Sequence, residues 1–342
     1  MSDYVGDIMS CINIEPYTEL ELDCYQNLLV TLVSYYKYDV KYLGAIWPWQ
    51  YVLLSQQNEF ENSILRLRNV ICASYERLKQ FYGIKVNIVN YDDYSDAWEQ
   101  IKAYLDKSIP VIVEVDQYYV HYHFPYIYKK QHGIYFVLLT GYNDSCTEAY
   151  CVDAIPYYKG MISVNELIEG MRSSAVDKKF YILDLPANKV DCGEDFVYSN
   201  LLDSLNQIKL SRSSSVSEVK LQKRIMLAND IICHINDWLI KKDDVELKEF
   251  IKILCDGTWG WEVERIGKWF AAYVQMPYVR SVFAGWEECV DLVSKNNYDW
   301  MVAFRLLFKG GQSKTRDMTY RALEKLTDIE LREQRIISLF TE

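Results

Sequence analysis

Four histidines and nine cysteines are the residues of this chain that can supply an imidazole base and a thiol nucleophile. The histidines are His121, His123, His132 and His234. The cysteines are odd in number and irregularly spaced, with no CxxC pair, so they give neither a zinc signature nor a disulfide framework. We therefore expect free thiols in a reducing cytoplasm, and no metal or other cofactor.

Cys24 is the cysteine that stands at a predicted helix start. Asp23 is a suitable N-cap, and apolar side chains follow it at helical spacing, which predicts a helix from Cys24 to Lys37. Backbone N–H groups and the helix dipole favour a thiolate at such a position. Cys24 is therefore the candidate nucleophile.

A cysteine nucleophile needs an imidazole to take its proton and a carboxylate to orient that imidazole. His132 immediately precedes the predicted strand Ile134 to Tyr142, and Asp153 ends the predicted strand Ala149 to Asp153. If these strands pair around the turn at residues 143–148, the two side chains come close at one end of the sheet. Cys24, His132 and Asp153 then form a papain-like catalytic triad.

The elements around this site predict a mixed helical and extended module. A longer helix is expected from Phe60 to Tyr82, ending at Gly83, and a shorter one over residues 95–107. Ser163 and Glu166 resemble a capping box that opens a helix to about Met171. Runs rich in Val, Ile, Tyr and Phe predict further strands at residues 85–90, 111–116 and 180–185.

Composition divides the chain near residue 195. Residues 1–195 hold 16 Lys and Arg against 27 Asp and Glu, and 24 of the 29 tyrosines, whereas residues 196–342 hold 21 of each charge. The second part shows helical periodicity at residues 219–240, 245–255 and 261–273, after a serine-rich loop at residues 211–217. We expect an α+β, papain-like catalytic domain at 1–195 and an all-helical domain at 196–342 that acts as a lid, docks a partner or makes a homodimer.

The net charge of −11 lies wholly in the first part. A strongly acidic surface argues against a nucleic-acid partner, because phosphate contacts need cationic side chains. It favours small cationic amines through a long-range field, or it simply keeps the protein soluble. The longest apolar runs are much shorter than the roughly 18 residues that span a bilayer, so no membrane partner is expected. The first 30 residues also show no secretory signal.

Three segments resemble the butirosin-biosynthesis acyltransferase family, which has a papain-like N-terminal domain. They are residues 23–29 (DCYQNLL), 109–119 (IPVIVEVDQYY) and 128–142 (YKKQHGIYFVLLTGY), and residues 152–153 and 160–163 continue the pattern. Within this family the chain resembles the cysteine-protease-like amide synthase of closthioamide biosynthesis. The resemblance implies acyl transfer from a phosphopantetheinylated carrier protein, through Cys24, to an amine or diamine.

One departure from the family pattern concerns the base. Many members of the family carry a histidine directly before the apolar strand, where this chain has Tyr135, and His132 stands three residues earlier. Strand alternation puts residues 132 and 135 on opposite faces, so His132 needs a bulge at Gly133 to act in its place. Two alternatives remain open: a papain-like cysteine peptidase or amidase, and an inactive binding module.

Other side chains receive weaker assignments. Asn27 and Gln26 are candidate oxyanion donors beside the Cys24 backbone N–H. Tyr135, Tyr119 and His121 are candidate lining residues of a pocket for an aromatic acyl chain, in a stretch dense with tyrosine. His121 and His123 form a His-x-His pair that suits a metal or a surface, and either could replace His132 as the base. His234 fits helix packing.

Overall fold

The computed structural model describes residues 11–20, 22–45, 51–54, 66–69, 74–190, 192–213, 232–233, 235–236, 259–312 and 316–341. The chain divides into two compact units, one of residues 1–40 and 73–191 and the other of residues 41–72 and 192–342. The predicted boundary at 195 lies close to the second junction, but residues 41–72 group with the C-terminal helices instead. Gly44 contributes to this grouping, because a Cβ atom there would lie 2.1 Å from the carbonyl oxygen of Trp269.

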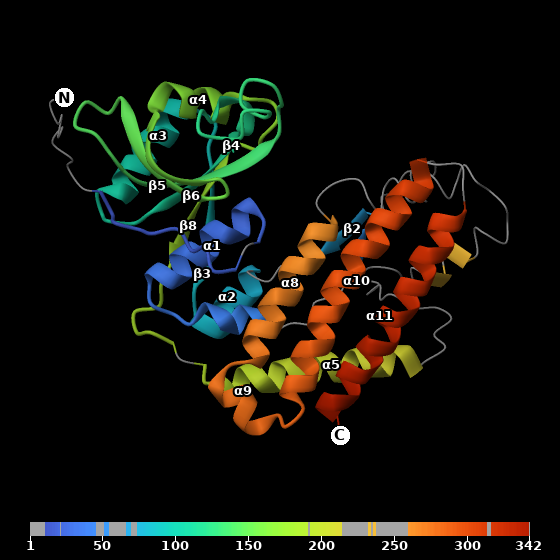
Figure 1. Cartoon of the computed structure of the whole chain (residues 1–342). Coiled ribbons are helices and arrows are strands. Elements are labelled where there is room, and N and C mark those ends of the chain that lie inside the picture. The colour runs from blue at the N-terminus through green and yellow to red at the C-terminus, as the bar shows by residue number, and fades with distance from the viewer. Residues whose placement is uncertain are drawn as a thin grey trace, which may run out of the picture. The chain divides into compact units, whose positions relative to one another are not determined.

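The first unit is built on a six-stranded antiparallel sheet in the order β3-β8-β4-β5-β6-β7 (Figure 1). The predicted strands are confirmed, with β4 and β5 at the expected bounds. One strand, β7, was not predicted, since Lys159 and Gly160 interrupt its pattern, yet it pairs along its whole length with β6. The strands are β3 (Lys85–Asn90), β4 (Val111–Asp116), β5 (Ile134–Tyr142), β6 (Glu148–Ala154), β7 (Tyr157–Ser163) and β8 (Lys179–Asp184).

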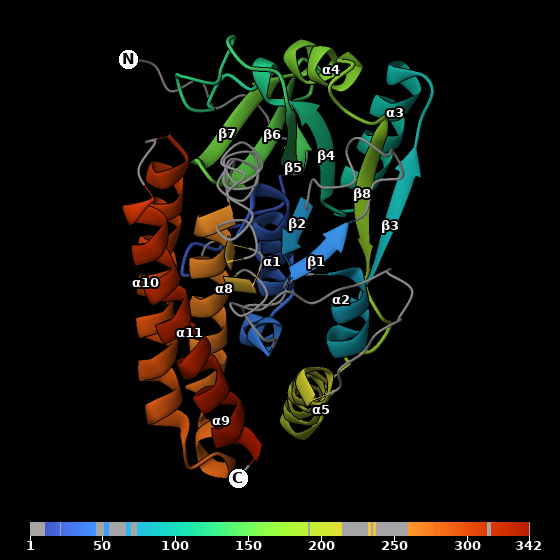
Figure 2. The ribbon, with the colours of Figure 1, turned by 90° about the vertical axis from the view of Figure 1, so that its right-hand side faces the viewer.

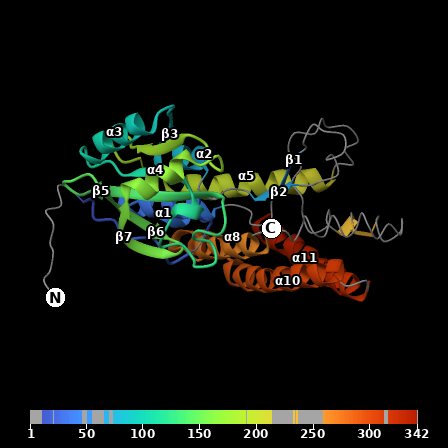
Figure 3. The same cartoon turned by 90° about the horizontal axis from the view of Figure 1, so that it is seen from above.

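Helices cover both faces of this sheet (Figures 1 and 3). On one face, α3 (Tyr94–Leu105) and α4 (Val164–Arg172) pack on a core that includes Val113, Tyr135 and Cys151. On the other face, Tyr25 of α1 (Cys24–Tyr35) packs against Phe136 of β5 at 4.6 Å between ring centroids. Each core side chain that is fully removed from water contributes about 1.5–3 kcal/mol. The mixed helical and antiparallel α+β class is therefore confirmed.

The long helix expected at residues 60–82 is wrong over part of its length. Residues 66–69 form strand β2 (Arg66–Asn69), which pairs antiparallel with β1 (Tyr51–Leu54). The helix α2 (Tyr75–Tyr82) begins only after Ser74, whose Oγ accepts the Arg77 N–H at 3.3 Å. This serine cap marks the true helix start.

The predicted capping box at the start of α4 is also wrong. Ser163 occupies the N-cap position without a side-chain cap bond. Glu166 instead accepts from the Tyr128 hydroxyl at 3.2 Å and contacts the His121 ring, also at 3.2 Å. Contacts of Glu166 with residues distant in sequence have therefore replaced the local capping bond.

The second unit is helical apart from β1 and β2 in the residues described. The long helices α10 and α11 lie side by side, with α8 along α10 (Figure 2). The expected helix at 261–273 is confirmed within α8, whereas those at 219–240 and 245–255, with His234, fall almost wholly outside the described residues. The first three residues of the expected serine-rich loop, 211–213, belong to α5, and the other four lie outside the described residues. The helices are α5 (Glu194–Ser213), α8 (Trp259–Val274), α9 (Pro277–Val282), α10 (Trp286–Gln312) and α11 (Asp317–Thr341).

Across the described ranges, no helix has both the length and the apolar character that crossing a membrane requires.

Candidate active site

Cys24 is the first residue of α1, as predicted. The N-cap Asp23 accepts the Gln26 N–H at 2.8 Å, which fixes the entry of the chain into the helix. Cys24 is a free cysteine that packs against the core between the sheet, α3 and α4. Its thiol interacts electrostatically with Asp153 at the end of β6 and with Tyr135 of β5. Three side chains from α1, β5 and β6 therefore gather at one place.

The expected activation of this thiol by the helix N-terminus is outweighed by its surroundings. Burial, with the nearby Asp23 and Asp153 carboxylates, raises the pKa of Cys24 to about 12, although the N–H groups of Cys24 and Tyr25 favour the thiolate. At neutral pH Cys24 is therefore a thiol. It becomes a competent nucleophile only if a neighbouring group takes its proton.

Asp153 is fully buried and is hydrogen-bonded by neutral groups. The Tyr135 hydroxyl lies 2.5 Å from its Oδ2, the Tyr122 hydroxyl donates to the same oxygen at 3.3 Å, and the Ile155 N–H donates to Oδ1 at 3.1 Å. In the described part of the chain, no lysine or arginine forms an ion pair with Asp153. Burial therefore raises the pKa of Asp153 to about 7, against the opposing hydrogen bonds.

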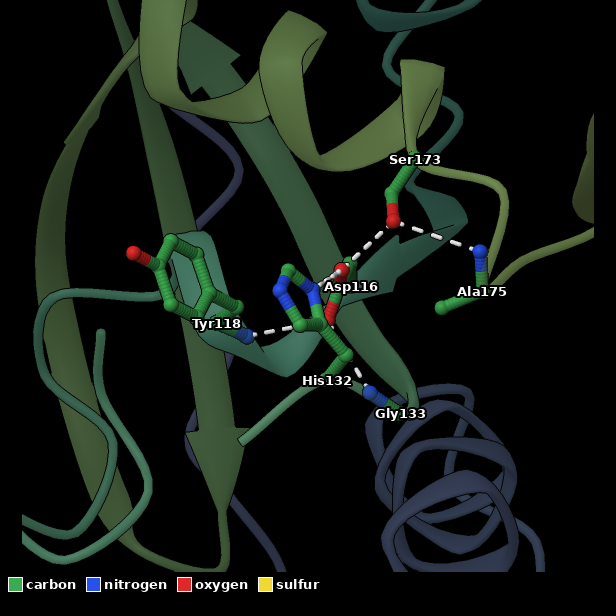
Figure 4. Close-up of polar contacts among 6 residues, drawn as sticks. All are labelled: Asp116, Tyr118, His132, Gly133, Ser173 and Ala175. Carbon is green, nitrogen blue, oxygen red and sulfur yellow. Dashed lines mark hydrogen bonds and ion pairs between the residues drawn. The ribbon is translucent and has the colours of Figure 1, made fainter. Parts of the chain in front are cut away.

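His132 does not contact Asp153, which corrects the expected pairing. Its Nδ1 lies 2.6 Å from Oδ2 of Asp116, at the end of β4, and its ring stacks on Tyr118 with 4.4 Å between centroids (Figure 4). No hydrogen bond joins the imidazole to the Cys24 thiol in the part of the chain that the structure describes. The His132 side chain is 59% exposed.

Asp116 is the residue of this site that sequence reasoning missed. Its carboxylate is fully buried, and it accepts from the Gly133 N–H at 3.0 Å, the Tyr118 N–H at 3.1 Å and the Ser173 hydroxyl at 2.5 Å. Burial opposes ionisation, but these bonds and the one to His132 outweigh it and lower the pKa of Asp116. An ionised Asp116 makes Nδ1 of His132 the donor, so Nε2 of the neutral ring is the acceptor that faces away.

A bulge in β5 explains why Asp153 meets Tyr135 and not His132. Tyr142 pairs with Ala149 and Leu138 with Val152, and the register shifts by one residue between Leu139 and Gly141. Without this shift Asp153 would share a face with even-numbered positions of β5, the face of residue 132. A one-residue shift moves it to the face of Tyr135. The departure from a regular strand expected at Gly133 is present, because residues 131–133 form an irregular segment before β5, but it is not a bulge.

The proposed oxyanion donors are engaged elsewhere. The Asn27 side chain accepts the Leu22 N–H at 2.9 Å and donates to the Leu22 carbonyl at 3.2 Å, bracing the segment before α1. The Gln26 side chain donates to Asp23. Both side chains build the helix start, so the backbone N–H of Cys24 is the oxyanion donor that remains from the sequence prediction.

Two of the proposed pocket residues, Tyr135 and His121, share the neighbour Tyr122, whose hydroxyl donates to Asp153 and whose ring centroid is 5.6 Å from that of His121. Tyr135 is buried at Asp153, whereas Tyr119 packs on Tyr118 with 5.0 Å between ring centroids. His121 lies between Glu166 and the Tyr158 hydroxyl, 3.3 Å from its Nε2. The structure does not bring these three side chains together.

The two histidines of the His-x-His pair face different surroundings. His123 is buried, its ring 4.5 Å from that of Tyr135 between centroids, and its Nδ1 accepts the Phe124 N–H at 2.7 Å. Burial lowers the pKa of His123 to about 4, so its ring is neutral at pH 7 with the proton on Nε2. No group of three or more potential metal ligands gathers within the described residues.

The candidate site residues Cys24, Asp116, His132 and Asp153 all lie within one region that is similar to a known family. Residues 23–154 match the family model described as butirosin biosynthesis protein H, N-terminal. This match supports the resemblance carried by the three segments. It begins at the N-cap Asp23, ends just after Asp153, and contains Cys24, Asp116 and His132. No curated protein matches the chain.

Proposed function

We propose that this protein is a cysteine-dependent acyltransferase of natural-product biosynthesis, which forms an amide between a carrier-bound acyl chain and a small amine or diamine. The observation that carries the proposal is the placement of Cys24 at the start of α1, against the Tyr135–Asp153 pair, inside the region that matches the butirosin protein H family. Amide formation is a prediction that comes from the resemblance to the closthioamide amide synthase.

In this proposal Cys24 attacks the thioester carbonyl and releases the carrier's phosphopantetheine thiol. The Cys24 N–H stabilises the oxyanion, and an amine then attacks the acyl-enzyme to form the amide. The acidity of residues 1–195 supports a cationic acceptor. The His132 imidazole, which is exposed and held by the buried Asp116 with Nε2 as its acceptor, suits the removal of a proton from the entering amine.

Intact-protein mass spectrometry tests the reaction class. With a synthetic acyl pantetheine thioester, we expect an acyl adduct on the Cys24 peptide, and its loss as an amide when a diamine is added. Release as a free acid at the same rate with and without the diamine would instead indicate a hydrolase or peptidase.

One observation favours a second candidate, a binding module without turnover. A phenol occupies the position of the family's usual imidazole, and the Cys24 thiol is protonated at rest. Saturable binding of the thioester with no adduct over hours would support that function.

Replacement of His132 is expected to separate the two halves of the reaction. The His132→Ala variant should load Cys24 normally, because the ring is bonded to Asp116 and not to the thiol, but it should form amide about 10²- to 10⁴-fold more slowly. Rapid-quench measurement of adduct formation and decay gives both rates. A matching loss in the loading rate would show that His132 serves Cys24 directly, and normal amide formation would remove it from the mechanism.

A further inference from the structure

The Tyr135 hydroxyl has two acceptors and one proton. It lies 2.5 Å from Oδ2 of Asp153 and 2.5 Å from the carbonyl oxygen of Ile155. A hydroxyl donates one hydrogen bond, so it cannot donate to both oxygens at full strength. Both short contacts are satisfied only when a second proton is present, with Asp153 donating to the Tyr135 oxygen and Tyr135 donating to Ile155.

This geometry allows the pair two protonation states, each with its own set of hydrogen bonds. With Asp153 ionised, Tyr135 donates to the carboxylate. With Asp153 protonated, the chain runs from Asp153 through the Tyr135 oxygen to the Ile155 carbonyl. The pair can therefore accept one proton. Because the site is buried, leaving either polar group without a hydrogen bond would cost free energy.

The group that can deliver this proton is beside the pair. Cys24 packs against the core cluster that contains Tyr135, and its thiol, protonated at rest, is within electrostatic range of both Tyr135 and Asp153. The other titratable groups around Cys24 and the pair are Asp23 at the N-cap of α1, Cys151 on β6, and Tyr122 and His123 on the loop after β4, with Tyr158 of β7 stacked on Tyr122. Nδ1 of His123 accepts the Phe124 N–H, so the other ring nitrogen carries the proton and is a donor, not a base.

We propose that Tyr135 and Asp153 form a proton relay that accepts the thiol proton of Cys24, in the role that an imidazole fills in papain-like enzymes. As the sulfur–carbon bond to the acyl group forms, the thiol proton passes to the Tyr135 oxygen, and the Tyr135 proton passes to Oδ2 of Asp153. When the bond to the pantetheine sulfur breaks, the same path returns one proton to the leaving thiolate. In this relay Tyr135 exchanges the proton with the thiol, and Asp153 acts through Tyr135.

This relay deepens the proposed acyl transfer and rests on it for its acyl donor. The test of the relay does not depend on that acyl donor, because alkylation of Cys24 by iodoacetamide also needs loss of the thiol proton. The pH dependence of both reactions reports the relay, since a purely structural role of Tyr135 would lower a rate without removing an inflection.

The test compares Tyr135→Phe with Tyr122→Phe, which removes the other hydroxyl on the same carboxylate oxygen. In the wild-type protein, loading and alkylation should rise with an inflection near pH 7, where Asp153 ionises. Tyr135→Phe should lose the inflection and slow both reactions by about 10²- to 10⁴-fold. Tyr122→Phe should keep the inflection at a higher pH, because the lost hydrogen bond stabilised the ionised carboxylate.

Asp153→Asn provides a second variant with nearly the same shape as the wild type, and circular dichroism reports whether each variant folds. Asp153→Asn should also lose the inflection in the pH profile, as Tyr135→Phe does. Wild-type rates and an unchanged inflection in either folded variant would overturn the relay. A Cys24 adduct that forms normally in Tyr135→Phe would leave the acyltransferase proposal standing, whereas alkylation without any acyl adduct in the wild type would contradict that proposal alone.

Discussion

Replacing Cys24 with alanine is expected to abolish both the acyl adduct and amide formation, with a loss of about 10³-fold or more in rate. The sulfur is the atom that bonds to the acyl group, so no other group can replace it in a covalent mechanism. The fold should persist, because alanine is the best helix former and Asp23 still caps α1. Adduct mass and product formation from a carrier-bound thioester measure the effect.

Cys146→Ala is the matched control. Cys146 is a free cysteine in the turn between β5 and β6, remote in sequence from α1 and outside the proposed machinery. It should load and transfer as the wild type does. An acyl adduct that persists in Cys24→Ala and disappears in Cys146→Ala would move the nucleophile to that turn.

The strands that lead to the site could be predicted from sequence, because they depend on local pattern. The β-branched and aromatic runs fixed the bounds of β4 and β5, and Asn143 marked the turn through its side-chain bonds to the N–H groups of Thr147 and Glu148. The same reasoning failed at residues 66–69, where pairing with β1 overrides helical periodicity.

The partners within the site could not be predicted, because they depend on one residue of register. The turn-side pairing of Tyr142 with Ala149 places Asp153 on the face of residue 132, as the sequence reasoning assumed. The shift between Leu139 and Gly141 reverses that face, and its one local signal is Gly141, a glycine inside the strand that the sequence pattern assigned to the turn. Asp116 could have been found from the sequence, because it is the last residue of β4, and β4 pairs with the start of β5, just after His132.

The buried Asp153 carboxyl should also make the stability of the protein depend on pH. Burial raises the pKa of Asp153 to about 7 in the folded protein, against about 3.9 in an unfolded chain. Between these values the folded state binds more protons than the unfolded state, so the free energy of unfolding falls as pH rises from about 4 to 7. Three pKa units correspond to a loss of about 4 kcal/mol.

Asp153→Asn is neutral at every pH and should escape this loss. We expect it to unfold at a similar free energy to the wild type at pH 5 and to be more stable at pH 8 by about 2.5 kcal/mol, since about two of the three pKa units lie above pH 5. Urea unfolding followed by tyrosine near-ultraviolet circular dichroism is a suitable measurement, because 24 of the 29 tyrosines lie in residues 1–195. Asp144→Asn, at an exposed turn position, should change the difference between the two pH values by less than about 0.5 kcal/mol. If the wild type and Asp153→Asn differ equally at pH 5 and pH 8, then Asp153 carries no proton in this range and cannot be the acceptor at the end of the relay.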